Sequence, residues 1–172
     1  GKLTGGFYSA NREVEAISSI ENLYGTMRFT PSITVNYTPF DWFSNRLVVG
    51  ADVSNGEITA FFPKNDKGWY QGSTNTGSLQ EHRTNNTIYT IDYLGRLQHQ
   101  LRAGLASTLS IGAQIITQQY DRVTGSGIGF VTNANRVVSS AAEISASQDF
   151  SDDRSVGLLA QGELAWQDRL FL

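Results

Sequence analysis

Apolar and polar residues alternate along five stretches of this chain. In the first stretch, residues 28–38, the apolar positions are Phe29, Ile33, Val35 and Tyr37, and the polar positions between them are Thr30, Ser32, Thr34, Asn36 and Thr38. Side chains of a β-strand point to opposite faces with a period of two residues, so this pattern predicts a strand with one apolar and one polar face. Pro31 interrupts the pattern. Because proline cannot donate a ladder hydrogen bond, we expect it near a strand end or at a bulge.

The same alternation predicts four further strands, at about residues 45–60, 84–97, 103–120 and 155–166. The five strands are roughly 11 to 18 residues long, whereas strands of globular proteins most often have about 5–6 residues. A tilted strand that crosses a membrane needs about 9–11 residues. The predicted fold class is therefore all-β, an antiparallel meander of about five long strands that forms part of a transmembrane β-barrel.

The connections between these strands alternate in length. Those at residues 39–44, 98–102 and 167–169 are short, whereas residues 61–83 and 121–154 form long connections rich in Gly, Asn, Ser, Thr and Asp. Outer-membrane barrels have short periplasmic turns and long extracellular loops. The predicted organisation of this one barrel segment is therefore extracellular loops at 1–27, 61–83 and 121–154, hairpins at 28–60 and 84–120, and a strand with the start of the next at 155–172.

Two weaker elements fall within the expected loops. Residues 13–22 place Val14, Ile17 and Ile20 at helical spacing, which predicts a short helix inside the first extracellular loop. Residues 139–149 are compatible with a further short strand inside the last loop.

The composition fits a single sheet between lipid and water. Apolar residues make up 40% and charged residues 17%, below the averages of about 45–50% and about 25% for soluble proteins. The net charge of −3 gives no electrostatic basis for binding nucleic acid. The absence of cysteine excludes disulfides and zinc–thiolate sites. No apolar run is long enough for a transmembrane helix, and the first residues do not form a signal peptide.

Aromatic residues gather at the expected short turns. Trp42 and Phe43 lie in the first turn, and Trp166 and Phe171 flank the last. Amphipathic rings favour the headgroup zone of a membrane, so we expect these four residues at the periplasmic interface; ordinary packing at the end of a soluble barrel is the alternative. Trp69 and Tyr70, in the first long loop, are candidate ligand contacts, although loop aromatics also pack within their own loop.

Candidate catalytic and metal-binding residues are few. The polar strand faces carry Asp52, Asp92, Arg96, Gln114, Gln161 and Glu163. The sequence pairs neither Asp92 nor Glu163 with a second group, so no enzymatic use is expected. The acids near 65–66 and 149–153 lack the spacing of an EF-hand and are expected to be solvated. The glycine-rich Gly125–Gly129 has no lysine, and no nucleophile elbow or P-loop is present. We expect no cofactor and no bound metal.

Three runs together resemble a known family. Residues 28–42, residues 89–95 (Tyr-Thr-Ile-Asp-Tyr-Leu-Gly) and residues 166–172 (Trp-Gln-Asp-Arg-Leu-Phe-Leu) are similar to the barrel of SusC/RagA-like TonB-linked outer-membrane proteins. The likeness covers nearly the whole chain, from about Glu13 onward. It implies a role in the import of large nutrients such as oligosaccharides or peptides, with energy supplied through TonB and a SusD-like surface lipoprotein as lid. The chain departs from the family in having no plug domain, no TonB box and too few strands.

We therefore expect a wall segment of a TonB-dependent importer in the bacterial outer membrane. Its partners would be outer-membrane lipid, the rest of its own barrel and plug, TonB and a SusD-like lipoprotein. Five strands cannot close a barrel, and the chain stops where a sixth strand starts at Leu170, so we expect either a fragment or a subunit completed by other chains. Two alternatives remain open: a smaller or multi-chain outer-membrane barrel or structural envelope protein, and a soluble β-rich carbohydrate-binding module.

Overall fold

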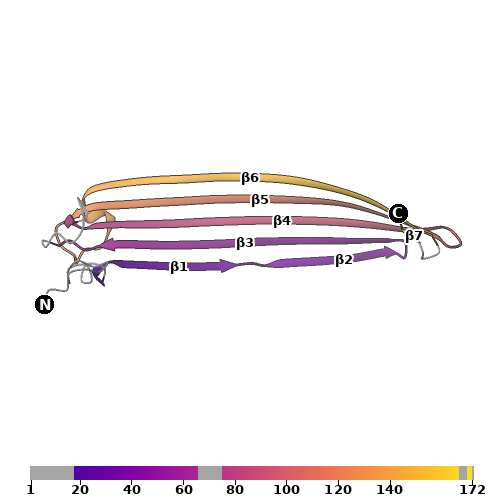
Figure 1. The fold of residues 1–172 in the computed structure, drawn as a ribbon, viewed down its shortest axis with the longest axis horizontal. Helices are drawn as coiled ribbons and strands as arrows, with labels where there is room; N and C mark the ends of the chain where they lie inside the picture. Colours follow the sequence, from indigo (N-terminus) through magenta and orange to yellow (C-terminus); the bar gives the residue numbers. More distant parts are fainter. Residues whose placement is uncertain (1–17, 66–74, 167–169, 172) are drawn as a thin grey trace, which may run out of the picture. The chain divides into compact units, whose positions relative to one another are not determined.

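A computed structural model of the chain describes residues 18–65, 75–166 and 170–171, and strands dominate it (Figure 1). The strands are β1 (Glu21–Phe29), β2 (Ser32–Phe40), β3 (Phe43–Phe62), β4 (Ser78–Arg102), β5 (Leu105–Phe130), β6 (Ala141–Trp166) and β7 (Leu170–Phe171), and a 3-10 turn, η2 (Val138–Ser140), precedes β6. None of the described residues belongs to a helix long and apolar enough to cross a membrane.

All seven strands belong to one sheet in the order β1-β3-β4-β5-β6-β7, and β2 pairs with β3 beside β1. The segments β1 and β2 thus form one interrupted run along the same neighbour, as Figure 1 shows. Each long strand pairs with the strand before and after it in the sequence, which confirms the predicted antiparallel meander of about five long strands.

Proline causes the interruption between β1 and β2. Pro31 lies between the last residue of β1 and the first residue of β2, as its missing N–H group predicts. Pairing with β3 continues across the gap, because the Ala51 amide donates a hydrogen bond of 3.0 Å to the Pro31 carbonyl. The Cα register then places Ile33 opposite Val49 and Val35 opposite Leu47.

The first two short connections are two-residue turns, and the third, expected at residues 167–169, lies outside the described residues. Asp41 and Trp42 join β2 to β3, as expected for residues 39–44. The second turn is Ala103–Gly104 rather than residues 98–102, where β4 continues. Gly104 has a φ of 82°, the left-handed conformation that tight hairpin turns require and that glycine adopts without steric cost. The glycine therefore sets this turn, and the polar residues before it do not.

The strands extend beyond the alternating stretches. β4 begins at Ser78, β5 continues to Phe130 and β6 begins at Ala141, so residues 139–149 are not a separate short strand but the start of β6. The expected long connections therefore shrink to about residues 63–77 and 131–140. Strand pairing depends on backbone hydrogen bonds, whereas alternation depends on a difference between the two faces; the strands persist where that difference fades.

The expected helix at residues 13–22 lies largely outside the described residues. Ser18 and Ser19 have helical geometry, but β1 begins at Glu21, so the helix does not reach Asn22. Residues 21–27, expected in the first loop, belong to β1.

The chain divides into two compact units that share the long strands. Unit 1 comprises Gly1–Met27, Ser54–Asn85 and Asp121–Phe150, and unit 2 comprises Arg28–Val53, Asn86–Tyr120 and Ser151–Leu172. All the buried large apolar side chains of the described residues lie in unit 1.

The core of unit 1 is small. It consists of Phe61, Leu79 and Phe130, each at most 3% exposed, with Val138 and Ala141 packed against them. The rings of Phe61 and Phe130 meet edge to face, with centroids 6.1 Å apart. The Arg136 guanidinium lies 4.8 Å from the centroid of the Phe61 ring and also pairs with Glu21. This cluster fixes the ends of β3, β4 and β5 in unit 1.

Two glycines let the backbone pass close to this core. Gly77 and Gly129 have φ angles of 87° and 82°, and the Gly129 amide donates a hydrogen bond of 2.9 Å to the Gly77 carbonyl. A Cβ atom at Gly129 would lie 3.1 Å from the Cβ of Ala142. Asn133 ties the neighbouring segment to Lys64, accepting from its amide and donating to its carbonyl.

Replacing Leu79 with alanine is expected to destabilise unit 1 by about 2–5 kcal/mol, because it leaves a cavity in a core of only three large side chains. The effect can be measured as the loss of amide hydrogen-exchange protection around Phe61 and Phe130. Leu101→Ala is the matched control, since this leucine is 50% exposed; equal losses of protection for the two variants would contradict the assigned core.

Replacing Gly129 with alanine should cost about 1–2 kcal/mol, because an L-residue is strained at positive φ and the new methyl group would press on Ala142. Hydrogen exchange of the Gly129 amide reports the loss directly. Gly157→Ala, where a Cβ atom meets nothing within 4 Å, should leave protection nearly unchanged; full protection in Gly129→Ala would refute the strain argument.

Candidate functional site

The two faces of unit 2 differ sharply in chemistry. On one face, which we call the outer face, the register of β2 and β3 aligns Ile33 with Val49 and Val35 with Leu47. The hydrogen bond from the Tyr93 hydroxyl to the Asn45 side chain places the odd-numbered residues of β4 on this same face. Its exposed large apolar side chains are Ile33, Val35, Tyr37, Leu47, Val49, Tyr89, Ile91, Tyr93, Leu109, Ile111, Ile115, Val156, Leu158 and Leu164.

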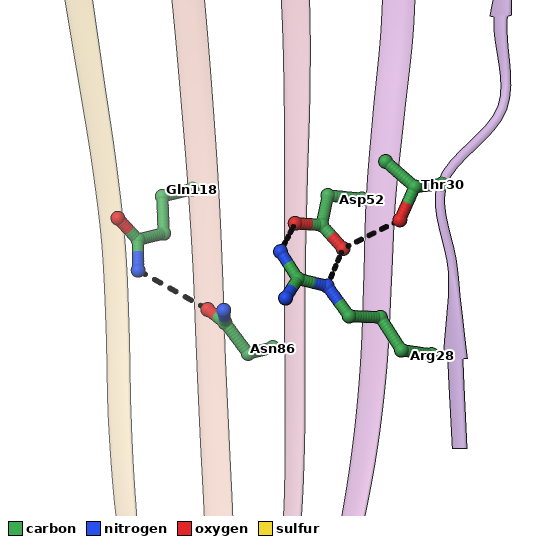
Figure 2. Close-up of polar contacts among 5 residues, drawn as sticks. All are labelled: Arg28, Thr30, Asp52, Asn86 and Gln118. Carbon is green, nitrogen blue, oxygen red and sulfur yellow. Dashed lines mark hydrogen bonds and ion pairs between the residues drawn. The ribbon is translucent and has the colours of Figure 1, made fainter.

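The opposite, inner face of unit 2 carries polar pairs that link neighbouring strands. Gln114 donates to Asp92, which joins β4 and β5 through even-numbered residues. Gln118 donates to the side-chain carbonyl of Asn86 over 3.1 Å, as Figure 2 shows. Each pair leaves part of its hydrogen-bonding capacity free, because a carboxylate accepts more than one hydrogen bond and an amide both donates and accepts. The face can therefore bind polar groups without a catalytic step.

An ion pair joins β1 to β3 beside the interruption between β1 and β2. The Arg28 guanidinium donates through Nε and Nη2 to the two carboxylate oxygens of Asp52, at 2.9 and 2.5 Å, and the Thr30 hydroxyl donates to one of them at 3.4 Å (Figure 2). The two-pronged geometry suits a guanidinium and a carboxylate. Because the Arg28 side chain is 64% exposed, water screens the pair and its contribution to stability is small. Its main consequence is positional: it holds the side chains next to Pro31 against β3.

A hollow of about 630 Å³ on the inner face of unit 2 includes the Gln114–Asp92 pair in its lining. Arg46, Asp92 and Gln114 contribute polar groups, and Leu94 and Leu159 contribute apolar ones. Gly112 forms its floor: a Cβ atom there would lie 3.3 Å from the Tyr93 carbonyl oxygen and 3.4 Å from the Cβ of Leu159. The glycine therefore permits close approach of β4, β5 and β6, and a larger side chain would fill the hollow.

The carboxylates singled out in the sequence do have partners. Asp92 accepts from Gln114, and Glu163 accepts from Gln161 at 2.9 Å. The expectation that nothing pairs with them was wrong, because two-residue spacing along β6 and strand neighbours across the sheet bring amides beside them. These partners are neutral amides, which neither take up nor release a proton near neutral pH. The arrangement fixes the carboxylates in place but supplies no acid–base couple.

The acids considered for calcium lie in a strand and not in a loop. Asp152 pairs with Arg154 at 3.2 Å, and Asp153 accepts a hydrogen bond from Ser151. Asp66 lies outside the described residues. Among the residues that the structure does describe, no three His, Asp or Glu side chains come together in a way that could hold a metal ion.

The aromatic residues expected at the membrane interface lie at strand ends. The Trp42 ring stacks on Phe40, with centroids 5.2 Å apart, and on Phe43 at 5.7 Å, and it remains 50% exposed. Trp166 ends β6, is 55% exposed and pairs through its backbone with Leu170 of β7. Phe171 belongs to β7. An interface role for these residues stays a prediction.

The two loop aromatics proposed as ligand contacts, Trp69 and Tyr70, lie outside the described residues. Two groupings were missed in the sequence: Arg28 with Asp52, and His82 with Arg122 and Thr124, whose contacts join residues at least 22 positions apart. Parity along each strand placed Asp52 on the polar face, but only the register between strands reveals which residue lies beside it.

Comparison with solved structures gives the fold a precedent. The chain superposes on the RagAB peptide transporter with a TM-score of 0.81 at 11% sequence identity. Two states of the RagAB peptide importer, "open-open" and "closed-closed", give TM-scores of 0.80 and 0.78 at 12% identity. In each case the match covers 90% of this chain but only 17% of the other chain.

No protein-family model and no curated protein sequence matches the chain. At 11–12% identity the structural likeness concerns the fold alone. The chain is thus an all-β sheet with the fold of a section of the RagAB transporter, and it spans about one sixth of the length of the chains it resembles.

Proposed function

We propose that this chain is a wall segment of a TonB-dependent outer-membrane importer that takes up large nutrients such as oligosaccharides or peptides. The observation that carries the proposal is the outer face of unit 2, on which β2, β3, β4, β5 and β6 each contribute exposed large apolar side chains. Ile33 is 69% exposed and Leu158 is 85% exposed. An apolar face of this extent is unfavourable in water but matches the apolar band of a barrel against lipid.

The polar inner face supports the same proposal. A membrane barrel needs strands that alternate between an apolar outer side and a polar lumen. The amides and carboxylates of the inner face, such as Gln114 with Asp92 and Gln118 with Asn86, suit contact with water, a plug domain or a polar nutrient. The structural neighbours are described as transporters and importers of peptides, which favours peptides as the nutrient.

In this role the chain performs no chemistry. Its outer face seals against outer-membrane lipid, and its two free sheet edges pair with the remaining strands of the barrel, because no unpaired strand edge is stable in lipid. TonB and a SusD-like surface lipoprotein are the further proposed partners. Trp42, Phe43, Trp166 and Phe171 are proposed to lie in the periplasmic interface, and Trp69 and Tyr70 to contact the nutrient.

A lysine at the centre of the outer face should impair assembly. We expect Ile111→Lys, in the full-length protein, to make folding into lipid vesicles less favourable by about 2–4 kcal/mol, because the ammonium group must be buried in hydrocarbon. The folded fraction of each variant can be measured across a urea series from unheated gel samples, in which folded and unfolded protein migrate differently.

Ser110→Lys is the matched control for this substitution. Ser110 is the neighbouring residue of β5 and points to the inner face, so its lysine should remain in water and cost little. Equal losses for the two variants would contradict a membrane-facing outer face.

Spin labels should distinguish the two faces directly. The chain has no cysteine, so single cysteines can be introduced without background labelling. Labels at residues 109, 111 and 115 should collide more often with oxygen, which partitions into lipid, and labels at residues 108, 110 and 114 with a water-soluble nickel complex. If collision rates show no period of two along β5, or if the full-length protein stays monodisperse in water without detergent, the soluble binding module becomes the better account.

A further inference from the structure

One arginine of unit 1 stands apart from the other described arginines. Arg28, Arg83, Arg136 and Arg154 each pair with a carboxylate, and Arg46, Arg96 and Arg102 are exposed to water. Arg122, in β5, is half-buried, and among the described residues it makes no ion pair. A guanidinium stays charged at every physiological pH, so this charge is partly removed from water without a counter-charge.

The partners of Arg122 are neutral. Its Nη2 atom lies 3.0 Å from Nδ1 of His82, and the Thr124 hydroxyl lies 2.9 Å from the same nitrogen. Because a guanidinium can only donate, Nδ1 must be the acceptor, and the ring proton of the neutral imidazole must lie on Nε2. His82, which itself contacts Thr124, therefore orients the guanidinium without neutralising it.

The donors of Arg122 are also mostly unused. A guanidinium has five N–H groups in a planar fork, and within the described residues Arg122 has one hydrogen-bond partner, His82. The neighbouring residue of β4, Arg83, points to the opposite face and pairs there with Glu57 at 3.1 Å. The surroundings of Arg122 thus offer positive charge and free donors on the face that carries His82.

From this we propose that Arg122 is the anchor of an anion-binding site that takes a single carboxylate group of a ligand, with His82 and Thr124 as positioning residues. One cation balances one negative charge, which favours a carboxylate over a doubly charged phosphate. A carboxylate also matches the planar fork of a guanidinium with two parallel hydrogen bonds. The site goes beyond the proposed transport role and depends only on the packing of unit 1.

The test compares two small probes that differ in charge alone. Dansyl-glycine carries a carboxylate, and dansyl-glycinamide carries a neutral amide in its place. Binding to the full-length protein in detergent can be measured by fluorescence, and the ratio of the two dissociation constants isolates recognition of the carboxylate. We expect the unaltered protein to prefer the carboxylate by about tenfold, the strength of a charge-assisted pair of hydrogen bonds at a partly exposed site.

Arg122→Gln should reduce this ratio to about one, and Arg83→Gln, on the opposite face, should leave it unchanged. Arg122→Lys keeps the positive charge but removes the planar pair of N–H donors, so it should retain only part of the preference for the carboxylate. A partial preference in this variant also shows that the loss in Arg122→Gln does not come from misfolding. Thr124→Val should weaken the preference without abolishing it. Gel mobility of unheated samples shows which variants are folded.

The proposal fails if the unaltered protein does not discriminate between the probes, or if discrimination survives Arg122→Gln. It also fails if inorganic phosphate displaces dansyl-glycine more effectively than acetate at equal concentration, since the site would then prefer a doubly charged anion. None of these three results bears on the spin-label periodicity of β5, so the site and the membrane assignment are tested separately.

Discussion

The backbone hydrogen-bond ladder between long strands is the interaction on which the whole structure depends. Only three large apolar side chains of the described residues are buried, so a hydrophobic core does not hold the sheet together. The ladder continues even past Pro31, where the proline carbonyl still accepts from Ala51. A sheet held in this way leaves both faces available to their surroundings, and its function follows from what each face meets.

The two units differ in the side-chain packing that accompanies this hydrogen-bond ladder. Unit 1 adds a local core, in which Phe61, Leu79 and Phe130 pack together and glycines at positive φ let the backbone approach. Unit 2 has no such core, and its apolar side chains are exposed on the outer face. Under the proposed role, lipid takes the place of a core for the outer face of unit 2. Unit 1 also exposes large apolar side chains, among them Tyr24, Ile144 and Phe150, so its small core buries only part of its apolar residues.

The polar side chains of the two units differ in whether their hydrogen-bonding groups already have a matching partner. In unit 2 the Asp52 carboxylate is held by Arg28 and Thr30, and the amides of Gln114 and Gln118 are held by Asp92 and Asn86. These contacts orient the side chains at little cost, because most remain hydrated. Arg122 of unit 1 differs, since His82 orients it without balancing its charge, and the anion site proposed for it rests on this difference.

The sequence alone determined the fold class and the chemistry of the two faces. A period of two in residues such as Ile33, Val35 and Tyr37 depends only on strand geometry, and the count of five long runs followed from it. It also predicted Pro31 near a strand end or at a bulge and the first turn within residues 39–44. These features are local, so neighbouring residues in the chain are sufficient to specify them.

Only the tertiary structure decided where the strands end and which residues meet. Past the alternating stretches, β4, β5 and β6 continue because neighbouring strands supply their hydrogen bonds, and no single-strand pattern reports this. The pairing of Arg28 with Asp52 and of His82 with Arg122 depends on register, which aligns residues 24 and 40 positions apart. A one-residue slip in register would move every side chain of a strand to the other face, so these groupings belong to the assembled sheet and not to any one segment of the sequence.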